Sequence, residues 1–190
     1  MLDTTQAQNA TTPEEALAVT AFWQDAGLAM WFAKDQDFDQ RLRTRFLRTH
    51  EAAAAGSLSH WSETAQGALA LVILLDQFPR NAFRGTPRMY ATDEQARQIA
   101  DRALRAGHDR QVEEPSSLFF LLPFAHSEVL ADQERSVALA EPWGEPHRAH
   151  SRRHRDIVAC FGRFPHRNPI LGRAMRPEEQ QFLDEGGYAG

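Results

Sequence analysis

The sequence predicts an all-α protein of about seven antiparallel helices. Three observations lead to this fold class. Apolar residues recur three and four positions apart along most of the chain, as they do on one face of a helix. Glycine and proline separate these segments at short intervals, which is typical of short connections between neighbouring helices. No two segments of alternating hydrophobicity flank a tight turn, so the sequence gives no sign of a β-hairpin.

The first two helices begin at capping signals. Thr12 and Glu15 form a capping-box pattern with proline at the first helical position, and the helix is expected to run to about Phe32. The second helix is expected to begin at Asp37 and to stop at Gly56, where glycine can adopt the left-handed conformation of a helix end.

The third helix carries the longest apolar run and ends in a proline. It should begin near Ser59 or Ser62 and continue through the apolar residues 68–75 to Phe78. Pro79 should end it, because proline lacks the backbone N–H and its ring clashes with the preceding turn.

Four further helical segments complete the chain. A helix capped by Thr92 should end at Gly107, and residues 116–141 should form a helix interrupted near Pro123. Residues 150–162 resume the helical spacing, and a short last helix should start at Pro177.

Composition indicates one globular unit. With 190 residues, 42% of them hydrophobic and 25% charged, the chain can bury one sizeable core. We expect a flexible tail over residues 1–11 and a single all-helical domain over residues 12–190. The net charge of -5 provides no overall attraction to nucleic acid or to an anionic membrane, so neither is an expected partner.

The cytoplasm is the expected location. The N-terminus lacks the basic and apolar stretches of a secretion signal, and the longest apolar run, residues 68–75, is far shorter than the roughly 18 residues that span a bilayer. The lone cysteine, Cys160, excludes an internal disulfide, and its apolar neighbours predict a buried structural thiol.

Two similar segments, residues 74–86 and 161–173, contain Phe-Pro followed by Arg-Asn and later a Gly beside an Arg. We call them the first and second boxes. Their similarity is compatible with a duplicated helical hairpin or with convergence on one loop geometry, and the additional His166 in the second box argues against an exact repeat.

The boxes concentrate arginine among apolar residues, where a guanidinium group needs a partner. Each arginine either pairs with an acid inside the fold, such as Asp76, or binds an anionic ligand through bidentate hydrogen bonds. The two asparagines either satisfy carbonyls at helix ends or contact the ligand. The candidate ligand-binding residues are Arg80, Asn81, Arg84, Arg163, Arg167, Asn168 and Arg173.

A third polar group lies in residues 122–133. Glu128 and Asp132 are four positions apart and would share one helical face. Imidazoles and carboxylates here could support acid–base chemistry, an internal hydrogen-bond network or a divalent metal, but no H-E-x-x-H pattern favours metal. The candidate catalytic residues are Asp76, His126, Glu128 and His166; no metal ligands are assigned, and the sequence leaves open whether a cofactor binds. His147 and His150 are expected to be solvated because SRRHR surrounds them with positive charge.

Three segments resemble the signature blocks of the domain-of-unknown-function family numbered 924: residues 69–86, 119–133 and 161–173. The Phe-Trp…Trp-Phe segment at 22–32 and EEQQFL near the C-terminus are also similar, so the resemblance covers most of residues 14–186. It implies a tetratricopeptide-like array of helical hairpins and no particular activity. Met175-Arg176 stands where the family tends to have small hydroxyl residues, which puts the cap of the last helix in question.

Two functions compete at this point. In the first, the boxes and the third polar group form a polar cleft that binds a small anionic ligand, with or without acid–base catalysis. In the second, the helical array binds a protein or peptide and the polar blocks brace the helices. Pairing of all five box arginines with acids would favour the second function. The sequence leaves open whether the protein is an enzyme and what its oligomeric state is.

Overall fold

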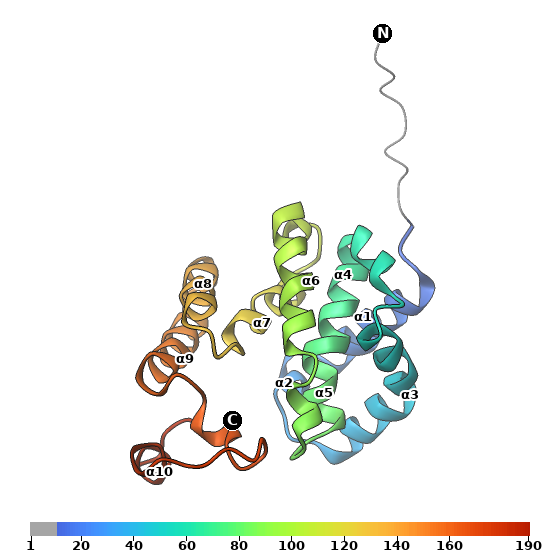
Figure 1. The fold of residues 1–190 in the computed structure, drawn as a ribbon. Helices are drawn as coiled ribbons and strands as arrows, with labels where there is room; N and C mark the ends of the chain where they lie inside the picture. Colours follow the sequence, from blue (N-terminus) through green and yellow to red (C-terminus); the bar gives the residue numbers. More distant parts are fainter. Residues whose placement is uncertain (1–10) are drawn as a thin grey trace.

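The computed structural model describes residues 11–190, and all regular secondary structure in that range is helical, as predicted (Figure 1). The predicted tail lies outside the described residues except for Thr11. The α-helices are α1 (Glu14–Ala26), α2 (Leu28–Trp31), α3 (Gln36–Ala54), α4 (Ala65–Val72), α5 (Phe78–Ala82), α6 (Asp93–Ala106), α7 (Leu122–Ala125), α8 (Leu130–Ala140), α9 (His147–Phe161) and α10 (Pro177–Asp184). Short 3-10 helices are η1 (Ser59–Glu63), η3 (Pro87–Tyr90), η4 (His108–Arg110), η5 (Ser116–Phe120), η6 (Glu141–Trp143) and η7 (Pro165–Arg167).

The predicted first helix is divided in two. Gly27 has a φ of 75°, a conformation that favours glycine, and it ends α1 before α2 begins. No side chain caps α1, so the capping box expected at Thr12 does not form. The cap of α3 is Asp35 rather than the expected Asp37, because the Asp35 carboxylate accepts a 2.7 Å hydrogen bond from the backbone N–H of Phe38.

The prediction that Pro79 ends the third helix is wrong, because a π-helical turn, η2 (Ile73–Gln77), joins α4 directly to α5. The N–H of Phe78 bonds to the carbonyl of Ile73, five residues earlier. This wider turn lies where the ring of Pro79 would otherwise meet the carbonyl of Leu75. The helix therefore continues through the proline to Ala82.

The carbonyls of this π-helical turn find partners outside the helical ladder. Side chains from three elements donate to them: His50 Nδ1 to Leu74 at 2.9 Å, Thr92 Oγ1 to Leu75 at 2.5 Å, and Arg80 Nη1 to Asp76 at 2.6 Å. The hydroxyl expected to cap α6 is therefore used elsewhere, and α6 begins without a side-chain cap. These bonds fix the position of Asp76, which is central to the candidate site.

The predicted long helix over residues 116–141 is interrupted later than expected, at 126–129. The buried amide of Gln133 donates to the carbonyls of Ala125 and Ser127, at 2.8 and 2.6 Å, where α7 ends. Glu128 lies in the interruption and not on α8, so it does not share a helical face with Asp132. Together with Gly27, this division explains why about seven helices were too few.

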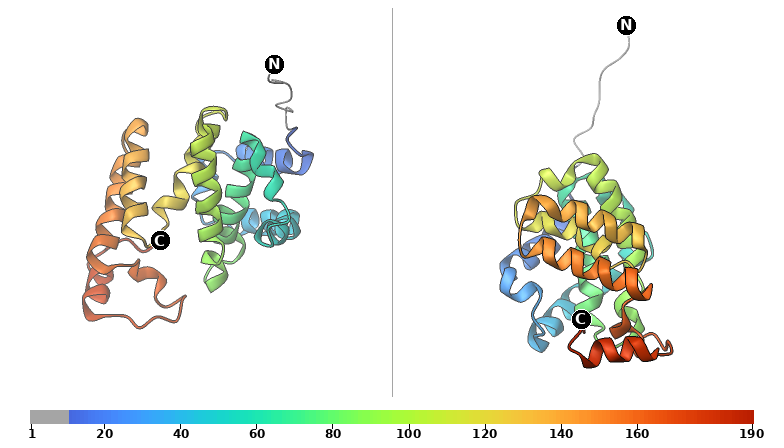
Figure 2. Two further views of the ribbon diagram at one scale, coloured as in Figure 1. Left: turned by 45° about the horizontal axis from the view of Figure 1, so that its top comes forward. Right: turned by 90° about the vertical axis from the view of Figure 1, so that its left-hand side faces the viewer.

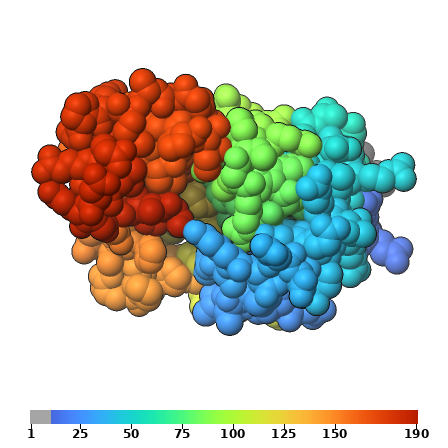
Figure 3. Space-filling view, turned by 90° about the horizontal axis from the view of Figure 1, so that it is seen from below, coloured from blue at the N-terminus to red at the C-terminus, as the bar shows by residue number. Residues whose placement is uncertain are grey.

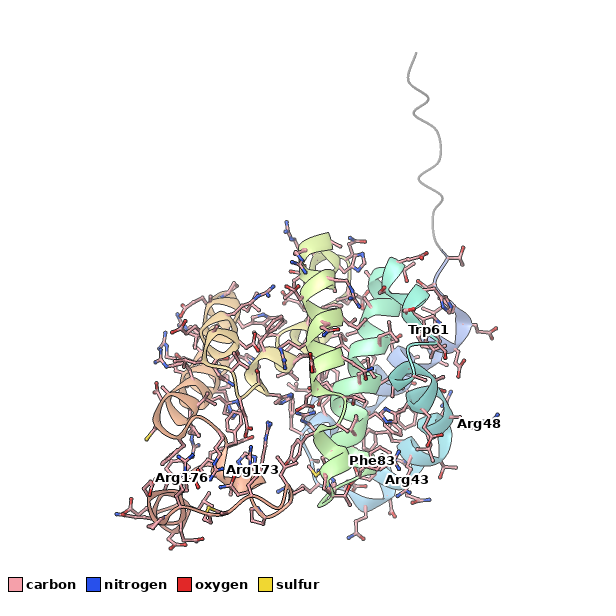
Figure 4. The ribbon with its side chains drawn as sticks, in the orientation of Figure 1. Arg43, Arg48, Trp61, Phe83, Arg173 and Arg176 are labelled. Carbon is pink, nitrogen blue, oxygen red and sulfur yellow. The ribbon has the colours of Figure 1, made fainter. Side chains whose placement is uncertain are left out.

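Helices α1, α3, α4, α5 and α6 form an N-terminal bundle, and α8, α9 and α10 form a C-terminal part beside it (Figures 1 and 2). The large hydrophobic core lies in the bundle, and a separate small cluster of Ile157, Val158 and Phe164 lies in the C-terminal part. Figure 4 labels Arg43 and Phe83 where α3 meets α5. None of the helices formed by residues 11–190 combines the length and apolar character needed to cross a bilayer.

Several polar contacts join the two parts. Arg97 of α6 bonds to Asp132 of α8 at 3.0 Å, and Asp101 of α6 bonds to Arg135 of α8 at 2.6 Å. Two further connections, Asp76 with His126 and Asp93 with Arg167, lie at the candidate site.

Candidate functional site

The space-filling view in Figure 3 shows a hollow between the C-terminal part and the N-terminal bundle. Six side chains meet at the boundary between these two parts, and each comes from a different helical element. We call them the central cluster: Asp76 (η2), Arg80 (α5), Tyr90 (η3), Asp93 (α6), His126 (end of α7) and Arg167 (η7).

Asp76 is the buried acid of the central cluster, with no exposed surface. Its carboxylate lies 2.8 Å from Nδ1 of His126 and 3.2 Å from Arg80 Nη1, and it also accepts a hydrogen bond from the amide of Gln77. Burial acts to raise the pKa of this carboxyl, but the charge of Arg80 and the interaction with His126 outweigh burial and lower the pKa to about 2. Asp76 is therefore a carboxylate at neutral pH.

His126 connects Asp76 to solvent. Since Asp76 is ionised, Nδ1 of the imidazole carries the proton and donates to it. Nε2 has no hydrogen-bond partner among residues 11–190, and the side chain is 17% exposed. Burial, followed by the charge of Arg80, lowers the pKa of His126 despite the opposing effect of Asp76. His126 therefore presents a neutral nitrogen that can accept a hydrogen bond or a proton at the boundary of the two parts.

Two arginines share Asp93. Arg80 binds both of its carboxylate oxygens, at 2.8 and 3.0 Å, and this ion pair together with Asp76 raises the pKa of Arg80 although burial opposes it. Arg167 reaches Asp93 only at 3.8 Å. Arg80 thus makes close ion pairs with both aspartates and His126 donates to Asp76, whereas Arg167 has only a distant, weak electrostatic partner.

Arg167 is also the most buried of the box arginines. It is 7% exposed, and burial lowers its pKa. Its guanidinium lies over the rings of Tyr90 and Phe164, at 4.6 and 4.5 Å, and donates to the carbonyl of His126 at 2.9 Å. Within the described part of the chain its Nε has no hydrogen-bond partner. A buried, incompletely paired guanidinium is a natural place for an anionic group to bind.

The remaining candidates of the first box belong to a different cluster. Arg84 makes two bonds to the carboxylate of Asp39, at 2.5 and 3.1 Å, and Asn81 donates to the same carboxylate at 2.7 Å. This arrangement fastens α5 to the start of α3. Asn81 and Arg84 were expected to contact the ligand, but their side chains pair with Asp39 and do not join the central cluster.

The second box likewise divides its polar side chains between two acids, the buried Glu179 and the partly buried Glu128. Arg163 binds both oxygens of Glu179 at 2.6 and 2.8 Å, and Asn168 donates to Glu179 at 3.0 Å. Arg173, labelled in Figure 4, binds both oxygens of Glu128 at 2.6 and 2.9 Å. The carboxylate expected to act in catalysis at position 128 is therefore engaged by an arginine expected to bind ligand.

Glu179 also resolves the cap of the last helix. Its carboxylate accepts a 2.8 Å hydrogen bond from the backbone N–H of Arg176, so α10 starts without a small hydroxyl residue. The bond from Arg163 lowers the pKa of Glu179 to about 2. The acid thus serves both as a helix cap and as the partner of the second box.

His166 lies at the edge of the central cluster. Its half-buried ring contacts the rings of Phe164 and Tyr188, with centroids 5.7 and 5.1 Å away. Burial and then the charge of Arg167 lower its pKa to about 4. Of the predicted catalytic and binding residues, the structure therefore brings Asp76, Arg80, His126 and Arg167 together with His166 beside them.

Sequence reasoning missed two members of the cluster. Asp93 follows a helix cap, where an acid is expected merely for its interaction with the helix dipole. Nothing in the sequence around Tyr90, apart from its aromatic side chain, indicates that it belongs to a site.

Cys160 is exposed, contrary to the expectation of a buried thiol, because its side of α9 does not face the core. Over residues 11–190, no group of three or more His, Cys, Asp or Glu side chains is arranged to hold a metal ion.

Comparison with known proteins identifies the family. A solved structure of a protein of unknown function from Agrobacterium tumefaciens is 51% identical to this chain, has a TM-score of 0.90, and is matched over 93% of this chain and 100% of that one. No curated protein matches the sequence. Residues 19–187 match the family described as "Bacterial protein of unknown function (DUF924)", and this chain belongs to that family.

Proposed function

We propose that the protein binds a small anionic molecule at the central cluster and moves a proton to or from it through the Asp76–His126 pair. The observation that carries the proposal is the position of Nε2 of His126: it is a neutral, unpartnered base among the described residues, oriented by a buried carboxylate and adjacent to an incompletely paired arginine.

Arg167 supplies the anion-binding group. Its guanidinium bonds directly to the carbonyl of His126, so an anion held by Arg167 lies close to the imidazole. The surrounding rings of Tyr90 and Phe164 lower the local dielectric and strengthen the charge–charge interaction.

His126 supplies the proton acceptor. Nδ1–H remains bonded to Asp76 while Nε2 takes a proton from an O–H or N–H group of the bound molecule, which converts the imidazole to imidazolium and leaves the negative charge on the ligand. Asp76 stabilises the imidazolium and holds the required tautomer, a role that carboxylates play beside catalytic histidines.

The test is a thermal-shift screen of small carboxylates and phosphate esters, followed by calorimetry of any ligand found. Arg167→Met should weaken binding roughly 10- to 100-fold, since a hydrogen bond to a charged group contributes about 1.5–3 kcal/mol. His126→Gln should keep binding and remove any proton transfer. Arg84→Met, which removes a box arginine outside the central cluster, is the control and should bind as the parent protein does. Equal binding by the parent and Arg167→Met would exclude Arg167 as the anion site.

A protein- or peptide-binding role is the second candidate, and it would use a tetratricopeptide-like arrangement of hairpins. The observation in its favour is an open groove of about 430 Å³ between α9 and α10, with Ile157, Phe161 and Phe182 among its lining residues. Selection from a displayed peptide library tests it: a selected peptide should lose binding to Phe161→Asp and retain it for Arg167→Met. Equal binding to Phe161→Asp would remove the groove as the peptide site.

A further inference from the structure

Four rings form a wall beside the central cluster. His154 lies 5.3 Å from Phe164 and 4.7 Å from Tyr188, and His166 contacts the same two rings at 5.7 and 5.1 Å. We call His154, Phe164, His166 and Tyr188 the imidazole wall. Arg167 packs on Phe164, so the wall is continuous with the proposed anion site.

The tautomer of His154 is fixed by its neighbour. Nδ1 lies 3.2 Å from the carbonyl of Ala125, and a carbonyl can only accept, so Nδ1 carries the proton. Nε2 is then a pure acceptor. The residue is 7% exposed, and Nε2 has no hydrogen-bond partner within residues 11–190. A buried acceptor of this kind requires a donor from elsewhere.

His154 lies near the groups that define the proposed site, because Nδ1 bonds to the carbonyl of Ala125, the residue before His126, and its ring contacts Phe164, on which Arg167 packs. Burial is the main cause that lowers the pKa of His154, to about 3. His166 likewise has a buried Nδ1 without a partner in the described residues, and Arg167 has the unpartnered Nε described above. Three incompletely paired buried nitrogens therefore surround one aromatic surface.

We propose that the ligand is a small polyhydroxylated anion, whose charged group binds Arg167 and whose hydroxyl groups donate hydrogen bonds to Nε2 of His154 and Nε2 of His126. This inference rests on the proposed function and specifies its ligand class. Two imidazole acceptors beside one cationic donor match a molecule that carries hydroxyl donors as well as a negative charge. The rings of Tyr188 and Phe164 offer an apolar surface for its C–H groups.

The test compares probes that differ only in hydroxyl groups. Gluconate and hexanoate share one carboxylate and six carbons, while glycerol 3-phosphate and propyl phosphate share one phosphate ester and three carbons. Calorimetry should show the hydroxylated probe of at least one pair binding about tenfold more tightly. The pair that shows the preference identifies whether the charged group is a carboxylate or a phosphate.

Two variants test whether the imidazole wall causes the preference for the hydroxylated probe. His154→Phe keeps the ring contacts and removes both nitrogens, so the preference should fall at least threefold, whereas the exposed His60→Phe should keep it. If His154→Phe does not fold, imidazole ¹⁵N spectra of the unaltered protein decide: the Nε2 resonance of His154 should move on addition of the hydroxylated probe.

The outcomes separate the two proposals. Equal affinity for the hydroxylated and unhydroxylated probes, with Arg167→Met weakening both, would overturn the polyhydroxylated class and keep the anion site. An Nε2 resonance of His154 that stays unchanged at saturation would also overturn the class. Absence of binding by all four probes to the unaltered protein would overturn the anion site and the ligand class together.

Discussion

At the scale of single residues, the box arginines divide into braces and one candidate ligand group. Arg80, Arg84, Arg163 and Arg173 each bind both oxygens of a carboxylate, and these bonds tie separate helices together. Arg167 is different because its nearest carboxylate is 3.8 Å away. The proposed anion site therefore consists of Arg167 beside His126, and not of several arginines that share one ligand.

Arg80→Met should lower the free energy of unfolding, so its effect is on stability and it is not a variant for ligand-binding experiments. It leaves the buried Asp76 and the partly buried Asp93 without their shared counter-ion, and removal of one partner from a buried ion pair costs about 3–5 kcal/mol. Arg84→Met removes a more exposed arginine, 34% against 15%, and should cost about 1 kcal/mol or less. Urea denaturation of both variants checks the prediction; equal losses of stability would contradict the role assigned to Arg80.

At the scale of elements, the π-helical turn is held by bonds that the local sequence does not encode. Its freed carbonyls bond to His50 of α3 and to Thr92 before α6, so two neighbouring elements stabilise the turn that positions Asp76. Such turns are frequent at functional sites. Here the wider turn accommodates Pro79, so the helix that contains Asp76 continues through the proline.

Thr92→Val should therefore lower stability by about 1–3 kcal/mol, because the buried carbonyl of Leu75 loses its donor. Thr86→Val is the matched control: its hydroxyl also donates to a carbonyl, that of Phe83, but the residue is exposed and water can replace the bond. Thermal unfolding of the two variants makes the comparison. A control that loses as much stability as Thr92→Val would show that the π-helical turn has no special dependence on Thr92.

Gly67→Ala should destabilise the protein, contrary to the usual effect of this change inside a helix, where alanine is favoured by about 1 kcal/mol. An added Cβ would clash with the backbone carbonyl of Trp61, because η1 packs directly on α4. Overpacking of this kind typically costs about 1–3 kcal/mol. Chemical denaturation checks the sign, with the neighbouring Gln66→Ala as control; a stabilised Gly67→Ala would contradict the close packing.

Helix ends determined by local chemistry could be predicted from the sequence. Gly107 ends α6 in the left-handed conformation, and Pro177 begins α10. Ends that depend on tertiary partners could not: the hydroxyl of Thr92 bonds to another helix, and Pro79 is accommodated by the π-helical turn. Gly27 divides a helix that its neighbours' hydrophobicity had predicted to be continuous.

The candidate site was predictable to the level of residue types. Concentrated arginine, histidine and acid in apolar segments led to Asp76, Arg80, His126 and Arg167, which do meet. Which acid each arginine binds depends on how distant helices pack, so the pairing of Arg173 with Glu128 and the inclusion of Asp93 required the structure.

At the scale of the whole molecule, polar contacts join the bundle and the C-terminal part. The buried His154 and the partly buried His126 and His166 lie at or beside this boundary. His154 of α9 bonds to Ala125 of α7, and its pKa is lowered to about 3, chiefly by burial. A histidine that is neutral when folded takes up a proton more readily when unfolded. Acid should therefore weaken the association of the C-terminal part with the rest of the protein.

The free energy of unfolding should fall as the pH drops from about 6.5, the ordinary histidine value, towards 3. At pH 4.5, protonation of His154 stabilises the unfolded state relative to the folded state by about 3 kcal/mol. Each pH unit between the two pKa values contributes about 1.4 kcal/mol. Asp76, with a pKa of about 2 in the folded protein and an ordinary value of 3.8, adds a further loss only below about pH 4, so the two effects are separable.

Urea denaturation of the unaltered protein and of His154→Phe at pH 7.5 and 4.5 measures this effect. His126 and His166, whose pKa values are also lowered, should still destabilise the variant in acid. The difference between its stabilities at the two pH values should be smaller than that of the unaltered protein by about 3 kcal/mol. The same difference in both proteins would mean that His154 is protonated equally in the folded and unfolded states. In that case the imidazole wall would be open to water, and the fixed acceptor at Nε2 of His154 would be lost.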